Sequence, residues 1–126
     1  MEKQLKMLRA LTRMALDVEM MKLQRFVRAE QRKAGQIQSL NKSGADRDAS
    51  LTNNGCADFA LYAGADDRWR MWKQKKIMTL NTQRASLIAA KDEQKMHTQK
   101  AFGKDEAVRR LVSKASDTAR LKHSKL

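Results

Sequence analysis

Residues 7–21, MLRALTRMALDVEMM, repeat large apolar side chains at heptad spacing. Met7, Leu11, Met14, Val18 and Met21 follow one another in alternating steps of four and three residues. This spacing places the five side chains on one face of an α-helix, as in the seam of a coiled coil. The stretch therefore predicts a long helix that packs on another helix through a single apolar stripe.

The stripe continues beyond Met21, although the strict heptad shifts there. Its further members, at steps of three or four residues, are Lys22, Phe26, Ala29, Lys33, Ile37 and Leu40. Such a shift changes the local supercoil and does not end a helix. We expect a first long helix over residues 1–43.

A second stripe predicts another long helix over residues 68–126. Its members are Leu80, Gln83, Leu87, Ala90, Gln94, His97, Ala101, Lys104, Val108, Leu111 and Ala115. The polar members in its middle lower the stability of a seam but specify its register or its partner.

The intervening residues 44–67 are acidic and rich in Gly, Asn, Ser and Asp, which favour turns. We expect a linker here, with a short helix or ordered loop in the apolar segment 56–63. The resulting fold is all-α: an elongated antiparallel two-helix coiled-coil hairpin that forms a single domain. Two chains that exchange helices across the linker would satisfy the same stripes.

The composition predicts a chain that binds no metal or cofactor. The 126 residues contain no proline and a single cysteine, Cys56, which favours a reducing compartment. His97 and His123 lie far from Cys56 in the sequence, so no pair has the spacing of metal ligands. No run approaches the ~20 apolar residues of a membrane span. We expect a cytoplasmic protein.

Catalysis has no support in the pattern of reactive residues. The acidic pairs Asp92-Glu93 and Asp105-Glu106 are adjacent in sequence, so their side chains diverge around a helix and cannot flank a substrate. No glycine-rich phosphate loop or histidine–carboxylate pair accompanies them. We expect neither an enzyme nor a small-molecule substrate.

The net charge of +13 allows three interpretations. The cations solvate the outer faces of a thin coiled coil, or dock on acidic protein surfaces, or bind the phosphates of a nucleic acid. The third interpretation rests on charge alone, because the chain contains no recognised nucleic-acid-binding motif and its basic residues alternate with acidic ones.

The sequence RWRMWK, residues 68–73, is the most distinctive local cluster. Trp69 and Trp72 lie three residues apart, which places them on one helix face where they would close the end of the hairpin. With Arg70 and Lys73 they also form a candidate contact patch, since Trp and Arg are enriched in binding hot spots.

The layout of two long helices, the basic balance and the segment AFGKDEAVRRL at residues 101–111 resemble the FliJ/YscO family of flagellar and type III secretion export stalk proteins. Residues 69–80 are compatible with the same pattern. The resemblance implies an antiparallel hairpin, like the central stalk of rotary ATPases, that inserts into the ring of an export ATPase and contacts an export gate and chaperones.

The resemblance also implies partner-binding residues. Residues 1–11 and 108–126 are candidates for the ATPase contact, and the tryptophan cluster is a candidate for the gate contact. The candidate residues are Met7, Leu8, Leu11, Trp69, Arg70, Trp72, Lys73, Val108, Arg109, Arg110 and Leu111. We therefore expect a non-enzymatic stalk or adaptor of bacterial flagellar-type protein export. The alternatives are a nucleic-acid-associated basic helical protein and a structural subunit that folds within a larger assembly.

Overall fold

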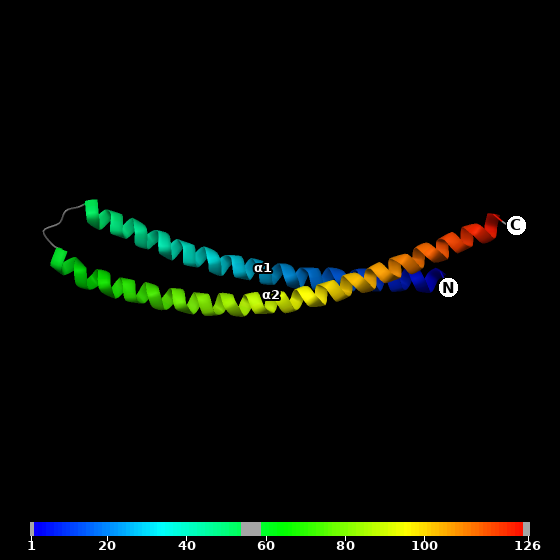
Figure 1. The fold of residues 1–126 in the computed structure, drawn as a ribbon, viewed down its shortest axis with the longest axis horizontal. Coiled ribbons are helices and arrows are strands. Elements are labelled where there is room, and N and C mark those ends of the chain that lie inside the picture. The colour runs from blue at the N-terminus through cyan, green and yellow to red at the C-terminus, as the bar shows by residue number, and fades with distance from the viewer. Residues whose placement is uncertain (1, 54–58, 125–126) are drawn as a thin grey trace. The chain divides into compact units, whose positions relative to one another are not determined.

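The computed structural model describes residues 2–53 and 59–124, and all of them are helical. Helix α1 spans Glu2–Asn53 and helix α2 spans Phe59–Ser124 (Figure 1). The described residues thus form two long helices that pack against each other as a hairpin, which confirms the all-α, two-helix prediction. The absence of proline from the sequence removes the strongest helix breaker.

The helix boundaries differ from the predicted linker at 44–67. Residues 44–53 continue α1, and residues 59–67 form the first turns of α2. Tertiary contacts account for this difference, because Gly44 is buried against α2 and Arg47 is ion-paired with Asp66. Such contacts override weak local helix propensity. The part of the predicted insert at residues 54–58 lies outside the described residues.

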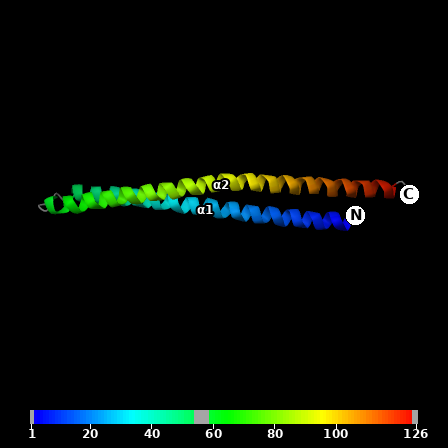
Figure 2. The same cartoon turned by 90° about the horizontal axis from the view of Figure 1, so that it is seen from below.

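The chain divides into two compact units, each containing a segment of both helices. Unit 1 comprises Met1–Phe26 and Ala90–Leu126, and unit 2 comprises Val27–Ala89. In each unit the α1 segment lies along the α2 segment and runs in the opposite direction (Figure 2). A single-domain organisation stays a prediction.

The seam is the row of buried and half-buried side chains along which the helices pack. In unit 1 Leu16 of α1 and Val108 of α2 are its most buried apolar members. On α1 the row consists of Leu5, Thr12, Leu16, Glu19, Leu23 and Phe26. From Thr12 onward these residues follow heptad steps of four and three. The seam of unit 1 therefore has coiled-coil spacing but mixed polarity.

The prediction that Met7, Leu11, Met14, Val18 and Met21 form this seam is wrong. Their exposed fractions lie between 49% and 67%. Their positions are displaced by two residues from those of the seam, and two residues correspond to about 200° around an α-helix. Both rows have heptad spacing, so spacing alone could not distinguish them. The helix turns the more apolar row outward.

The predicted α2 stripe is correct at Ala90 and at every seventh position from Leu80. Leu80, Gln94 and Val108 are buried, and the remaining correct members are half-buried: Leu87, Ala90, Ala101 and Ala115. The prediction is wrong at four intervening positions, where the exposed residues are Gln83, His97, Lys104 and Leu111. The next residue along the chain takes each place in the seam: Arg84, Thr98, Asp105 and Val112. Thr98 and Asp105 can thereby bond to polar groups of α1.

In unit 2 the seam residues also repeat mostly in steps of three and four, and Leu80 is the most buried apolar residue among those described. On α1 the half-buried members include Ala29, Lys33, Ile37 and Leu40, as the sequence predicted, whereas Lys22 of unit 1 is exposed. On α2 the row consists of Asp66, Trp69, Lys73, Ile77, Leu80, Arg84, Leu87 and Ile88. The predicted α1 stripe is therefore correct from Phe26 onward and wrong before it.

Polar side chains occupy much of both seams. The residues below a tenth exposed include three apolar ones, Leu16, Leu80 and Val108, and three polar ones, Asp66, Gln94 and Asp105. Among the described residues, no buried side-chain nitrogen or oxygen lacks a hydrogen-bond partner. Satisfied polar groups avoid the desolvation penalty but contribute less stability than apolar contacts. These polar pairs specify the register in which the two helices align, and they add little to the stability of the hairpin.

Candidate partner-binding surfaces

The apolar row that the seam leaves out is the first candidate surface. We call it the outer face, and it consists of Met7, Leu8, Leu11, Met14, Val18 and Met21 on α1 of unit 1. All six side chains are at least 42% exposed. Three of them, Met7, Leu8 and Leu11, were predicted as partner-binding residues. The heptad pattern also contains Met14, Val18 and Met21, but it predicts them as seam residues.

The border of the outer face is cationic. Lys3, Lys6 and Arg25 are exposed on the same helix. Asp17, the acidic residue beside the apolar row, lies 3.7 Å (Oδ1) from Nε of Arg13, so its charge is offset. An apolar face with this border combines a hydrophobic contact area with an attraction for negative charge.

Glu19 does not add negative charge to this border, because it is turned into the seam. The side-chain amide of Gln94 donates hydrogen bonds to the backbone oxygen of Glu19, at 3.1 Å, and to its carboxylate. The hydroxyl of Thr98 donates to the same backbone oxygen at 3.3 Å. The buried Gln94 thus links both helices at one position and helps fix which face of α1 points outward.

A second polar contact acts in the same way closer to the amino end of α1. The hydroxyl of Thr12 donates a 3.1 Å hydrogen bond to Oδ1 of Asp105, whose Oδ2 lies 4.0 Å from Arg13 Nη1. Asp105 is only 4% exposed. Because a buried carboxylate needs such partners, rotation of α1 to bring its outer face inward would leave Asp105 without Thr12.

The tryptophan cluster in unit 2 is largely engaged within the hairpin. Trp69 is half-buried, with the guanidinium carbon of Arg47 at 5.0 Å and Nζ of Lys73 at 5.7 Å from its ring centroid. These are cation–π distances. Trp72 is 52% exposed, so the expectation that both tryptophans close the seam holds only for Trp69. Trp72 remains the exposed aromatic of the predicted patch.

Arg70 anchors an ion-pair network beside this cluster. Its Nη2 donates a 2.9 Å hydrogen bond to Asp48, and its Nε lies 3.1 Å from Asp66. Arg47 Nε donates to the other oxygen of Asp66 at 3.0 Å. The hydrogen bond to Asp48, and then the charges of Asp48 and Asp66, raise the pKa of Arg70. The raised pKa reflects these ion pairs, since an arginine is protonated at ordinary pH even without them.

Gly44 leaves room for side chains of α2 at the same cluster. A Cβ atom at this position would lie close to the end of the Lys73 side chain and 3.5 Å from the Trp69 ring. Gly44 itself is buried within α1. The predicted binding residues Trp69, Arg70 and Lys73 therefore contribute to packing between α1 and α2.

The predicted residues near the carboxyl end of α2 separate into two groups. Val108 is 7% exposed and lies in the seam, whereas Leu111 is 51% exposed. Arg109 and Arg110 are exposed, and Arg109 Nη1 lies 3.9 Å from Glu106. Leu111 and Arg110 are thus accessible to a partner, while Val108 supports the helix pair beneath them.

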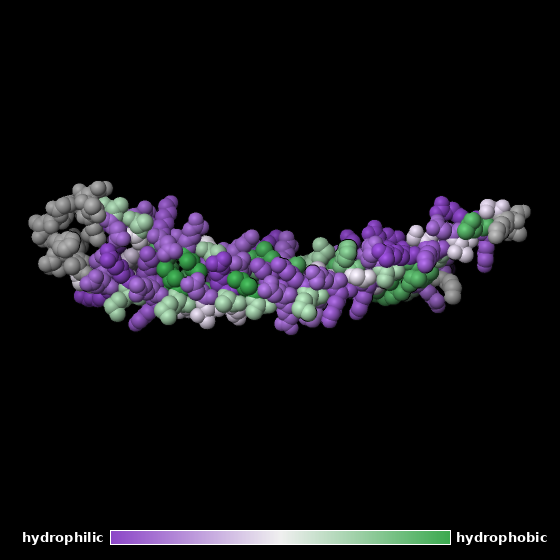
Figure 3. Space-filling view, viewed as in Figure 1, coloured by the Kyte–Doolittle hydropathy of each residue, from purple (hydrophilic) through white to green (hydrophobic). Residues whose placement is uncertain are grey.

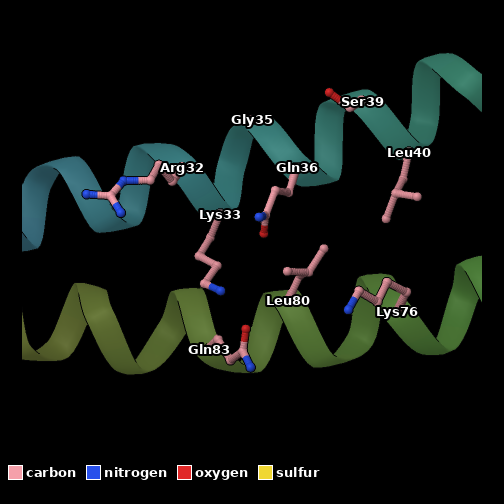
Figure 4. Close-up of a pocket in the computed structure, with 9 residues that line it drawn as sticks. All are labelled: Arg32, Lys33, Gly35, Gln36, Ser39, Leu40, Lys76, Leu80 and Gln83. Atoms are coloured by element: carbon pink, nitrogen blue, oxygen red, sulfur yellow. The ribbon is translucent and has the colours of Figure 1, made fainter.

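A groove in unit 2 is a further candidate surface, one that sequence reasoning missed. It encloses about 710 Å³ between the helices. Its lining residues are Arg32, Lys33, Gly35, Gln36, Ser39, Leu40, Lys76, Leu80 and Gln83. Figure 4 shows Lys33 and Leu40 of α1 pointing toward α2, and Leu80 pointing back toward α1. The lining contains three cations and no carboxylate, which suits an anionic group.

Hydrophilic side chains cover most of the molecular face drawn in Figure 3, and apolar ones form short patches between them. Neither helix, over its described length, contains an apolar stretch long enough to cross a membrane. Within residues 2–53 and 59–124, no group of three His, Cys, Asp or Glu side chains is arranged to hold a metal ion.

Comparison with known proteins gives no significant match to this chain, whether among family models, curated proteins or solved structures.

Proposed function

We propose that this protein is a non-enzymatic helical-hairpin adaptor, which acts by presenting side chains on fixed helix faces to protein partners. The observation that carries the proposal is the exposed apolar outer face of α1, bordered by cations. Contiguous exposed apolar residues with a polar border are typical of protein–protein contact sites. The polar contacts of Gln94 and Asp105 support the proposal, since they hold this face away from α2.

The proposed setting is bacterial flagellar-type protein export, in the cytoplasm and at the inner membrane through partners. The resemblance of residues 101–111 to the FliJ/YscO stalk proteins supports docking on an export ATPase and an export gate. The accessible residues at that end of α2 are Arg110 and Leu111. Charge would steer the basic chain to an acidic surface, and apolar contacts would hold it there.

Binding to the export ATPase of the same organism tests this setting. Purified chain and ATPase are mixed, and complex formation is measured by sedimentation velocity. Leu111→Glu is expected to weaken the complex by about tenfold or more. Met96→Glu, at an exposed α2 position of the same unit, is the matched control and should bind normally. The proposal of an export role fails if the wild-type chain does not bind the ATPase.

The groove supports one alternative function, nucleic-acid binding. Arg32, Lys33 and Lys76 line it without a carboxylate, and such cations bind phosphates. Fluorescence anisotropy with a random-sequence DNA duplex would test this function at several salt concentrations. Nucleic-acid binding would be supported by an affinity that falls steeply with salt and is lost in Lys76→Glu. A chain that binds the duplex weakly and independently of Lys76 would remove the alternative.

A further inference from the structure

The outer face of α1 has the properties of one half of a coiled-coil interface. We propose that it binds an amphipathic helix of another protein, whose own apolar heptad stripe is bordered by acidic residues. This inference rests on the proposed adaptor function and specifies the partner's chemistry.

The spacing of the outer face identifies a helix as the occupant. Met7, Leu11, Met14, Val18 and Met21 alternate in steps of four and three, which is the period that a second helix can follow over several turns. Isolated exposed apolar residues would need no partner. Here the exposed apolar side chains form one row along 15 positions of α1, or about 22 Å of helix. The partner helix should therefore be of similar length.

Methionine at every seventh position suits this role. Met7, Met14 and Met21 are all more than half exposed. Methionine side chains are flexible and polarizable, so they fill irregular gaps against different surfaces. Leu11 and Val18 alternate with them and supply the stiffer contacts.

The charges around the outer face favour a partner helix with acidic side chains. Its border carries the exposed residues Lys3, Lys6 and Arg25, while the charge of Asp17 is offset by Arg13. The next heptad position after Met21 is Arg25, so a cation ends the apolar row. A partner with Glu or Asp at its flanking positions would form interhelical ion pairs there.

A second copy of this chain is a poorer occupant. Parallel pairing of two outer faces would bring Arg25 against its own counterpart. Antiparallel pairing would place Lys3 and Lys6 near the partner's Arg25. Like charges across an interface are unfavourable, and the net charge of +13 adds general repulsion.

The test uses the full-length chain and two designed peptides of about 21 residues, both with leucine at a and d. One peptide carries glutamate at e and g, and the other carries lysine. Binding of the fluorescein-labelled peptides is measured by anisotropy. The acidic peptide should bind at least about tenfold more tightly than the basic one. Its affinity should fall when salt is raised from about 0.05 to about 0.5 M.

Variants locate the peptide on the surface. Met14→Glu should weaken binding of the acidic peptide about tenfold or more. Leu11→Gln tests the same face without adding charge and should also weaken it. Met96→Glu, at an exposed apolar position of α2 in the same unit, should bind as the wild type does. Circular dichroism should show unchanged helicity for all three, because none of these side chains lies in the seam.

Four results would overturn the inference: no binding of the acidic peptide; equal binding of both peptides; a wild-type dimer that Met14→Glu dissociates in sedimentation; or binding to phosphatidylglycerol vesicles that Met14→Glu abolishes. The export role is tested separately by the ATPase. A chain that binds the ATPase but not the acidic peptide would refute only this inference. A chain that binds the peptide but not the ATPase would refute only the export setting.

Discussion

Replacement of Leu16 by alanine, compared with replacement of Met14, distinguishes the seam of α1 from its outer face. Leu16 is 3% exposed, whereas Met14 is 64% exposed although it lies only two residues away. Removing a buried leucine side chain lowers the free energy of unfolding by about 2–5 kcal/mol. A seam between two helices can relax around the gap, so we expect about 2–3 kcal/mol for Leu16→Ala. For Met14→Ala we expect a change within about 0.5 kcal/mol.

Urea denaturation followed by circular dichroism measures both free energies. The two variants are matched, because each shortens one large apolar side chain to alanine within the same two turns of helix. The difference between them therefore reports burial and not helix propensity. The assignment of the seam would be refuted if Met14→Ala destabilised the chain as much as Leu16→Ala, or more.

Three further experiments test the packing. Gly35→Ala should raise the free energy of unfolding by about 0.5–1 kcal/mol in urea denaturation, since no described atom beyond the adjoining α1 backbone lies within 4 Å of the added Cβ. Gly44→Ala should raise it by less, because the end of the Lys73 side chain must move. A double-mutant cycle of Thr12→Val with Asp105→Ala should give a coupling of about 0.5–1.5 kcal/mol, and additivity would contradict their 3.1 Å hydrogen bond. Arg84→Ala should lower the free energy of unfolding by about 1–2 kcal/mol, because Arg84 Nε donates to the largely buried Glu30 at 3.0 Å; an equal loss in the exposed Arg68→Ala would contradict this.

The two-helix fold followed from the sequence because its heptad signals are long. The row through Ile37 and Leu40 and the positions Leu80 and Val108 repeat over many turns. Periodicity over such lengths is a reliable helix signal. The helix ends did not follow from the sequence, because Gly44, Asp48 and Asp66 are turn formers in isolation. In the structure they are helical and contact the opposite helix, and such contacts override weak helix propensity.

The identity of the outer face could not be predicted from spacing. In residues 5–23 two rows both repeat at heptad steps, and the more apolar one was the natural choice for a seam. The choice depends on what α2 offers opposite them. Gln94 and Asp105 are polar, so they favour Glu19 and Thr12 over methionines. That complementarity involves residues far apart in the sequence, and no local pattern contains it.

In the structure Thr12 faces α2 while Met14 faces outward, and disulfide trapping distinguishes these two orientations. Cysteine pairs are introduced at residues 12 and 105, and at 14 and 105, in a chain in which Cys56 is replaced by serine. After oxidation, the intrachain bond is detected by faster migration on a non-reducing gel. We predict that Thr12→Cys with Asp105→Cys forms the bond and that Met14→Cys with Asp105→Cys does not. If the second pair formed the bond and the first did not, Met14 rather than Thr12 would face α2, and the assigned orientation of α1 would be wrong.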